Sequence, residues 1–586
     1  MWMGFLIASV AAFFLIPTTI VLINKARGKK KFGLFKALPV GVYTAAILMF
    51  IPTHVDAWSL LTVVKTVALS IIKSAKVFTF GCDYEKLLIA IQNGAGELAT
   101  WYQAWAIVLL LIAPAFAIGF VLSFFKNILA EIEYIHAYRK DVYIFSELNE
   151  KSLALATDIA GKNKNIAIVF TKVVENALIE SANQLGAILF KKDICSIKFE
   201  KHSSSKAMFL FAIGLDENEN LNNALKLIEK YRTRKNTHLY VFSTKVESEM
   251  LLTEVDKGEI KVRRINQVYA LLNRFLYTEG VRLFSEARET EGDTKKISAI
   301  VLGMGNYGTE MTKALAWYGQ MDGYSIEINS FDKDPLAEQK FVARAPELMS
   351  PKFNGTKIEG EAEYKITIHS GVEVDSATFA EQISKITDAT YVFVALGDDD
   401  KNIATAVKLR MYFERMKIHP TIQAVVYNSQ QKNALEGIKN YSGQSYDVEF
   451  IGDNKSSFTD EVIVGTELEE KALESHLKWG KEESFWDYEY NYKSSIAAAI
   501  HKMARIFCEI PGAKKEFEDL TPEEEAIIGP LEHRRWNAYM RGEGYIFSGA
   551  TLKETRNNLG KMHHDLVEFD RLSEDEKKKD LQVGTK

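Results

Sequence analysis

Three glycines in the stretch SAIVLGMGNYGTEM have the spacing Gly-x-Gly-x-x-Gly, which lets a backbone approach a phosphate group. Gly303 would permit a tight turn, Gly305 the approach of the phosphate, and Gly308 close packing of the following helix on the strand. The helix that follows is predicted over TEMTKALAWYG, and its N-terminus would offer amides and a positive dipole to an anion; Asn306, in the turn before it, is a further candidate binding residue. Asp332 ends the next predicted strand, where a carboxylate can accept hydrogen bonds from ribose hydroxyls. The pattern predicts a nucleotide cradle; the alternative is the same fold with an empty cradle.

A second group of chemically capable residues lies near the C-terminus, within EHRRWNAYMRGEGY and the segment after it. Arginine can bind phosphate, an aromatic ring can stack on a base, and glutamate or histidine can form hydrogen bonds. Acid, imidazole, guanidinium and aromatic groups gather there within two helical turns, at Glu532, His533, Arg535, Trp536 and Tyr539. The alternative is structural: Trp536 belongs to the core and Arg535 pairs with Glu532.

The elements that would position the glycines occur twice. From Asp141 onward helical and strand periods alternate, which predicts parallel sheets covered by helices on both faces. The stretches AIGLDENENLNNALKL and ALGDDDKNIATAVKL align between the two copies. In the first copy, side chains from Ser146 to Glu150 replace the glycines, and Glu147 would repel phosphate. We therefore expect no dinucleotide in the first copy.

The composition and the absence of certain motifs argue against several classes of protein. The 586-residue chain is 47% hydrophobic and 25% charged with a net charge of -5, so nothing predicts an electrostatic grip on nucleic acid. The three cysteines form no CxxC or Cys/His spacing, so we expect neither a disulfide framework nor a metal site. No Ser/His/Asp arrangement, HExxH or Walker lysine follows either copy, so no catalytic residues are assigned and the chain is not expected to be an enzyme.

The first 125 residues belong in a membrane. Residues 2–24, 37–53 and 101–125 are apolar stretches that predict three spans, the second slightly short. The loop KARGKKKFGLFK between the first two holds six Lys/Arg, which places it in the cytoplasm and the N-terminus outside. A cleaved signal peptide is the competing interpretation of the first stretch, but its positive charges follow the apolar run.

An amphipathic helix is predicted over residues 57–78, with threonine, serine and lysine along one face. We expect it not to span, because lysines at a helix centre disfavour insertion and a fourth span would export the soluble part. It would either lie on the outer leaflet or form a re-entrant, pore-lining element in an oligomer.

The predicted fold is an α-helical membrane domain, tandem α/β Rossmann-like domains and a mainly α-helical C-terminal domain. The boundaries are 1–125 for the membrane domain, 126–290 for the first, degenerate α/β domain, 291–455 for the second, and 456–586 for the C-terminal domain.

The tandem α/β pattern, with its strand, Gly-Asp-Asp and helix start, resembles the RCK (TrkA-N-like) family of cytosolic nucleotide-binding domains in potassium channels and uptake systems. The C-terminal stretch resembles the ryanodine-receptor repeat (RyR domain), from its Glu-His-x-Arg-Trp-Asn helix to a closing segment at Lys561 to Leu572. Phe569 and His564 depart from that repeat, which usually has Tyr and often Pro there. Carried over onto this sequence, the motif of the repeat implies the candidate binding residues Glu532, Arg535, Trp536, Tyr545, Lys561 and His563. Bacterial relatives of the repeat occur beside RCK-like domains in membrane proteins and are linked to nucleotide-signalling immune systems.

The resemblance implies a ligand-gated membrane effector or ion channel whose cytosolic domains sense a nucleotide, of the cyclic or the NAD/ATP type, in antiviral (antiphage) defence. We expect a multi-pass protein of the cell inner membrane with cytoplasmic C-terminal domains. Its partners would be the membrane lipid bilayer, the nucleotide ligand and further copies in a dimer or tetramer, with no nucleic acid. Two alternatives remain: a regulatory or scaffold subunit of a potassium transport system, and a membrane-tethered NAD-dependent enzyme.

Overall fold

The computed structural model describes residues 1–26, 34–54, 59–79, 81–174, 177–199, 202–292, 294–354, 364–436, 447–465 and 467–586. Most of the basic loop, and the first two residues of the predicted amphipathic helix, therefore lie outside the described residues. The chain divides into two compact units, Met1–Glu133 and Tyr134–Lys586, and the boundary falls within helix α5.

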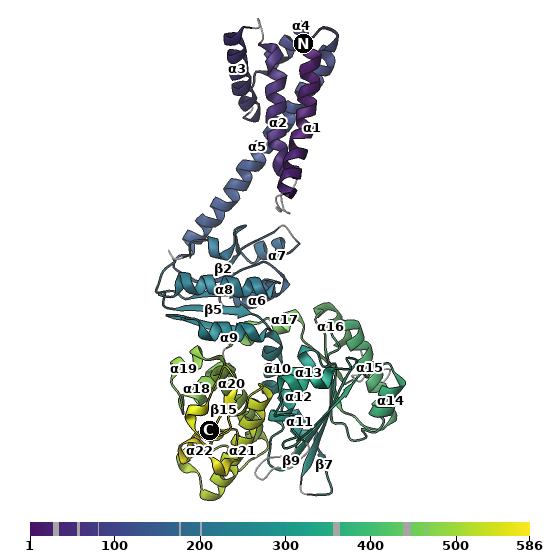
Figure 1. The fold of residues 1–586 in the computed structure, drawn as a ribbon, viewed down its shortest axis with the longest axis vertical. Coiled ribbons are helices and arrows are strands. Elements are labelled where there is room, and N and C mark those ends of the chain that lie inside the picture. The colour runs from purple at the N-terminus through teal and green to yellow at the C-terminus, as the bar shows by residue number, and fades with distance from the viewer. Residues whose placement is uncertain are drawn as a thin grey trace. The chain divides into compact units, whose positions relative to one another are not determined.

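The first unit is helical (Figure 1). Its elements are α1 (Trp2–Ala26), α2 (Leu34–Phe50), η1 (Ile51–Thr53), α3 (Leu60–Phe78), α4 (Tyr84–Gly94), η2 (Gly96–Leu98) and α5 (Ala99–His136). Ser9 of α1 joins three helices, because its hydroxyl donates to Ala45 O at 2.7 Å and accepts from Trp105 Nε1 at 2.8 Å. Leu15 and Leu111, among other large apolar side chains, are exposed on the outside of this unit.

Two stretches, Trp2–Ile23 and Gly96–Ala117, are long and apolar enough to cross a membrane by length and composition. Ala37–Thr53 is apolar but shorter. The same test is passed by signal sequences near an N-terminus and by buried helices of soluble proteins, so these helices alone do not establish a multi-pass membrane protein.

Helix α3 occupies the predicted amphipathic segment and packs on α2. Its Thr66, Ser70 and Ser74 are buried, whereas Leu61 and Ile72 are exposed. Small residues four apart let two helix backbones approach closely, as they do between membrane helices. The polar stripe of α3 therefore faces its own unit in this chain, and the apolar face is the outward one.

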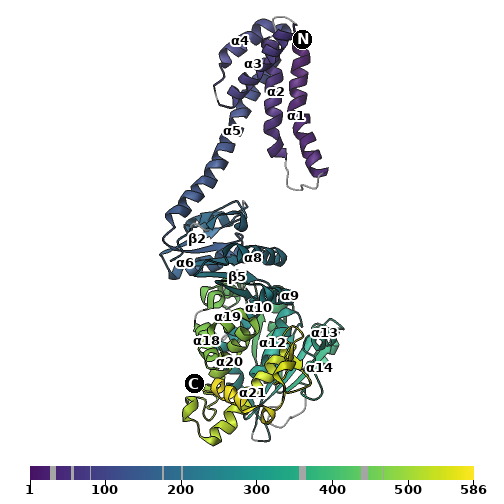
Figure 2. The same cartoon turned by 60° about the vertical axis from the view of Figure 1, so that its left-hand side comes forward.

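The second unit contains two parallel sheets between helices, which confirms the predicted α/β architecture (Figures 1 and 2). The first sheet has the order β3-β2-β1-β4-β5-β6. Its elements are β1 (Asp141–Phe145), α6 (Glu150–Lys162), β2 (Ile166–Phe170), α7 (Leu178–Gln184), β3 (Ile188–Leu189), η3 (Ile194–Ser196), β4 (Met208–Ala212), α8 (Glu217–Tyr231), β5 (Thr237–Phe242), α9 (Val246–Glu254) and β6 (Ile260–Ile265).

The second sheet repeats that order as β10-β9-β8-β11-β12-β13, with the short β7 antiparallel to β8. Its elements are α10 (Gln267–Thr278), α11 (Arg282–Ser285), β7 (Arg288–Glu289), β8 (Lys295–Leu302), α12 (Asn306–Tyr318), β9 (Tyr324–Asp332), α13 (Ala337–Arg344), β10 (Tyr364–Ser370), α14 (Ala377–Ile383), β11 (Tyr391–Val394), α15 (Asp399–Arg415), β12 (Thr421–Val425), α16 (Ser429–Glu436) and β13 (Val448–Ile451). In both sheets the strand order reverses beside the first strand, where such folds bind ligands.

Matched hydrogen bonds support the repeat. Asn220 accepts from Gly214 N and donates to Phe242 O at the end of β5. Asn402 accepts from Leu396 N and donates to Val425 O at the end of β12. Each asparagine thus ties a strand-to-helix turn to the end of the neighbouring strand, and the two aligned stretches are equivalent in structure as well as in sequence.

The C-terminal region is mainly helical, as predicted. It comprises α17 (Asn454–Ser457), η5 (Glu461–Gly465), α18 (Glu467–Leu477), α19 (Glu482–Asp487), α20 (Glu489–Phe507), η6 (Phe517–Asp519), α21 (Pro522–Gly542), β14 (Ile546–Phe547), η7 (Lys553–Thr555), β15 (Met562–His563), η8 (Phe569–Arg571) and α22 (Glu574–Gly584). Thr521 starts α21 with a capping box to Glu524, and Pro522 occupies the first turn. Helix α21 packs against α12 of the second sheet and against α22.

Candidate functional site: two cavities of the second unit

The predicted glycine cradle forms a cavity of about 360 Å³ at the carboxyl ends of β8, β9 and β11. We call it the cradle cavity. Its lining includes four of the predicted residues, Gly303, Gly305, Asn306 and Asp332. It also includes Lys333, Gly397, Lys401 and Tyr427, which the sequence did not single out.

Each glycine of the cradle has a distinct steric reason. Gly303 has φ +90°, and a Cβ there would lie 2.4 Å from Ala395 O, so the turn passes close to the end of β11. Gly308 does not line the cavity; its Cβ would lie 1.7 Å from Gly303 O, so it permits α12 to pack on the turn. A Cβ on Gly305 would meet no heavy atom within 4 Å. Gly305 therefore leaves open the space through which a ligand would reach the amides of α12.

The start of α12 suits an anion, because Gly305 is its N-cap and no side chain caps the first turn. Asp332 is held by backbone amides: Met304 N–H donates to Oδ2 at 2.5 Å and Asp334 N–H donates to Oδ1 at 2.7 Å. The carboxylate thus fixes the glycine turn against β9, and its remaining lone pairs are the ones that a ribose hydroxyl could use.

The matching edge of the first sheet is bridged by side chains. Ser146 Oγ accepts from Ile213 N–H at 2.9 Å, and Asn149 Nδ2 donates to Ile213 O at 2.8 Å. Asn149 also caps α6, in a capping box with Ser152. These bonds occupy the positions where the second copy has its open turn, which supports the expectation that no dinucleotide binds there.

A second cavity, of about 390 Å³, lies in the C-terminal region. We call it the C-terminal cavity. The structure brings Glu532, Arg535, Trp536 and His563 together in its lining. Tyr545 and Lys561 lie outside the lining: Tyr545 is buried in the core, and Lys561 Nζ donates to Glu543 O at 2.6 Å.

The structural alternative for Arg535 is partly realised. Arg535 Nη2 donates to Glu532 Oε1 at 2.5 Å, and both side chains are 1% exposed. Arg505 of α20 pairs with the same carboxylate. Trp536 is only half-buried and lines the cavity, with its ring at 4.9 Å from that of His563 in an edge-on contact. The pairing is therefore structural, whereas the indole is available to a ligand.

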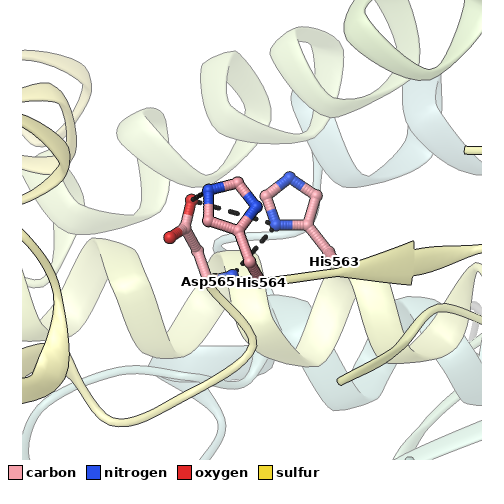
Figure 3. A group of neighbouring side chains, drawn as sticks. All are labelled: His563, His564 and Asp565. Atoms are coloured by element: carbon pink, nitrogen blue, oxygen red, sulfur yellow. Dashed lines mark hydrogen bonds and ion pairs between the residues drawn. The ribbon is translucent and has the colours of Figure 1, made fainter. Parts of the chain in front are cut away.

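His563 is oriented by the residues that follow it (Figure 3). Asp565 N–H donates to His563 Nδ1 at 3.2 Å, so in the neutral ring the proton is on Nε2. Burial, together with Arg556 and the nearby histidines, lowers the pKa of His563 to about 2. The ring is thus a neutral hydrogen-bond donor at physiological pH.

His563, His564 and Asp565 each offer one potential metal ligand within 4.8 Å of the others. Internal bonds account for this grouping, because Nδ1 of His563 already accepts a backbone proton and His564 Nε2 lies 3.3 Å from Asp565 Oδ2. The three side chains are drawn in Figure 3 with these contacts. These contacts fix the orientation of His563, and they explain the grouping without a metal ion.

Sequence reasoning missed part of the lining of the C-terminal cavity. It is formed by aromatic and basic side chains from three separate segments: Trp479, Tyr490, Lys553, Arg556 and Lys579. The only signal in the sequence was the aromatic-rich stretch FWDYEYNY, which an amphipathic helix explains equally well.

Comparison with protein-family models and with curated protein sequences finds no match to this chain. The assignment of a function therefore rests on the fold and on the two cavities.

Proposed function

We propose that the chain is a ligand-gated membrane effector, anchored by its N-terminal helical unit and switched by a nucleotide that binds its second unit. The observation that carries the proposal is the cradle cavity, where an uncapped helix N-terminus, an open Gly305 and the strand-end Asp332 meet. Amides, a helix dipole and a carboxylate at that spacing suit the phosphate and ribose of a nucleotide.

The outward apolar side chains of the first unit support the membrane part of the proposal. Phe14, Leu61 and Leu111 are all more than half exposed in a unit that holds both stretches long enough to cross a membrane. Large apolar side chains exposed on helices that are long enough to cross a bilayer suit contact with lipid. In the proposed arrangement the second unit is cytoplasmic, the protein is a homo-oligomer of the inner membrane, and ligand binding opens a path for ions in antiphage defence.

Gating requires that the ligand has different affinities for the closed and open states of the protein. To change a population from mostly closed to mostly open, the ligand must bind the open state more tightly by about 5.5 kcal/mol. A charged nucleotide can supply this through a few charge-assisted hydrogen bonds of about 1.5–3 kcal/mol each.

The experiment reconstitutes the full chain in lipid vesicles that contain a self-quenching dye. ATP, NAD and 3′,5′-cyclic AMP are added separately, and dye release is recorded against concentration. We expect at least one probe to release dye in a saturable way. Vesicles that stay sealed with all three probes would refute the proposal.

A matched pair of variants tests whether dye release depends on the cradle cavity. Gly305→Asp keeps a good N-cap in open space, yet places a negative charge where a phosphate would bind. Gly161→Asp, in α6 and also with no neighbour within 4 Å, is the control. If ATP or NAD is the active probe, only Gly305→Asp should weaken its effect, by tenfold or more.

A further inference from the structure

A buried group of three charges adjoins the C-terminal cavity, and two of its members, Glu532 and Arg535, line it. Arg505, Glu532 and Arg535 are 0%, 1% and 1% exposed. Both arginines donate to the one carboxylate, and their charge outweighs the effect of burial, so the pKa of Glu532 is lowered. Arginine stays protonated in proteins. These three side chains therefore carry a net charge of one positive unit.

Neighbouring titratable groups do not cancel that charge. His533 Nδ1 lies 2.9 Å from Asp580 Oδ2, and its Nε2 donates to Val567 O at 2.8 Å. The His533–Asp580 pair is neutral in sum whether the shared proton is on the imidazole or on the carboxyl group. Burial and the two arginines lower the pKa of His501 well below its ordinary value, so that ring is neutral too.

The remaining charged groups of the lining leave the excess in place. Lys579 pairs with Glu576 at 2.6 Å, and Asp565 faces His564 at 3.3 Å. Lys553 and Arg556 add positive charge to the lining.

The arginines also retain unused donors. Among the described residues, Arg535 Nη1 and Arg505 Nε are buried and have no hydrogen-bond partner. A buried donor without an acceptor costs roughly 1–3 kcal/mol, and more when the group is charged. Arg535 lines the C-terminal cavity, whereas Arg505 does not. An anion in the cavity beside Arg535 would compensate both the missing acceptor and the excess charge.

The aromatic residues of the C-terminal cavity suit a flat, uncharged ring. Trp479, Tyr490 and Trp536 supply aromatic surface. His563 supplies a neutral Nε2–H donor, fixed by the Asp565 amide. Aromatic stacking on a base is worth about 1–3 kcal/mol.

We infer that the C-terminal cavity is the receptor for a singly charged phosphodiester attached to an aromatic base, the chemical class of the cyclic nucleotides. This deepens the proposed function, on which it rests for its biological meaning. A phosphodiester has one negative charge at neutral pH and so matches the single positive charge of the buried group formed by Arg505, Glu532 and Arg535, whereas a phosphomonoester carries about -1.5 to -2. Arg535 contacts the phosphodiester and Trp536 contacts the base.

The experiment measures binding to the full chain in lipid nanodiscs by isothermal titration calorimetry. The probes are 3′,5′-cyclic AMP, AMP, adenosine and glycerophosphocholine; the last is a phosphodiester with no base and stands for a lipid headgroup. We expect cyclic AMP to bind at least tenfold more tightly than each of the others. Equal or tighter binding of AMP or of glycerophosphocholine would overturn the inference, as would no binding of cyclic AMP at millimolar concentration.

Variants separate charge from contact. Arg505→Met removes one positive charge from the buried group without altering the cavity lining, so it should weaken cyclic AMP binding tenfold or more and leave adenosine binding unchanged. Lys502→Gln, on the same helix but outside the buried group and the lining, is the matched control. Trp536→Leu should weaken the binding of both cyclic AMP and adenosine. If Arg505→Met bound cyclic AMP as the control does, the charge argument would be wrong.

Failure of this inference and failure of the proposed function are distinguishable. Gly305→Asp in the cradle cavity should leave cyclic AMP binding unchanged, because that residue lines the other cavity. Tight, Arg505-dependent binding of cyclic AMP without dye release would refute gating and uphold the receptor. Dye release by ATP or NAD, with cyclic AMP binding unaffected by Arg505→Met, would uphold gating and refute the receptor.

Discussion

Gly308→Ala tests whether the cradle is built by steric fit. The added Cβ would lie 1.7 Å from Gly303 O, whereas such contacts are essentially never below 3.0 Å. One of the two groups must therefore move by about 1.3 Å. The contact is with backbone, and Gly303 is itself constrained at φ +90° against Ala395 O. Helix α12 must consequently shift away from the sheet.

The expected cost of Gly308→Ala follows from two opposing effects. Overpacking costs about 1–3 kcal/mol, and alanine recovers up to about 1 kcal/mol of helix propensity. We expect a net loss of about 1–2 kcal/mol, which lowers the melting temperature by roughly 2–8 °C for a domain of this size.

The assay is differential scanning calorimetry of the full chain in nanodiscs. Gly305→Ser is the matched control, because its side chain enters open space and serine is a favourable N-cap. We expect it to melt at or above the temperature of the wild type. Equal melting temperatures for the two variants would refute the steric account of the Gly-x-Gly-x-x-Gly turn.

Three further predictions concern buried polar groups. Ser9→Ala removes a hydroxyl that hydrogen-bonds to both α2 and α5, so it should destabilise the first unit by about 0.6–1.7 kcal/mol. Thr18 hydrogen-bonds only within its own helix, so Thr18→Ala should not destabilise the unit. Thermal unfolding of both variants checks this. His563 stays neutral when folded but binds a proton below about pH 6.5 when unfolded, so wild type should lose about 2–3 kcal/mol more than His563→Gln between pH 6.5 and 4.5 in denaturant titrations. Lys493 and Glu543 form an ion pair in which each side chain is only 12% exposed. Lys493→Met or Glu543→Gln alone should therefore lower the free energy of unfolding by about 3–5 kcal/mol. In a double-mutant cycle, the double variant should lose clearly less than the sum of the two single losses.

The cradle was predictable because its constraints are local. Gly303, Gly305 and Gly308 act within one strand-turn-helix unit, and Asp332 ends the strand beside it, so spacing along the chain fixes their positions in space. Alternation of strand and helix periods likewise sufficed for two parallel sheets, since right-handed crossovers leave few other topologies.

The C-terminal cavity was only half predictable, for the opposite reason. Arg535 and Trp536 are consecutive on α21 and both line the cavity, yet Arg535 is buried in a pair with Glu532 whereas Trp536 is only half-buried. The partner that decides this, Arg505, comes from another helix about thirty residues earlier. No period or motif in a single sequence states which distant carboxylate or guanidinium a buried side chain will meet. Charge balance in a core is a tertiary property.

Helix α3 shows a similar limit. Its hydrophobic pattern correctly predicts a helix with one polar face, but the pattern alone assigns that face to water. In the structure Ser70 and Ser74 pack inward on α2, because small polar side chains allow close backbone approach. The pattern of a water-facing stripe and that of a helix-packing stripe are the same in sequence, and only the neighbouring helix distinguishes them.

Helix α21 connects the two cavities physically. Its Trp536 lines the C-terminal cavity, and the first turn of α12 forms the cradle. Helices α21 and α12 pack on each other (Figure 2). At its end, Glu543 accepts hydrogen bonds from Lys493 and Tyr269, the latter in the first turn of α10 beside the cradle. Close-packed interiors transmit displacement and do not absorb it. A ligand that moves α21 must therefore either carry α12 with it or break the packing between these two helices. A movement of the end of α21 away from α20 would also break the Lys493–Glu543 pair, at a cost of about 3–5 kcal/mol.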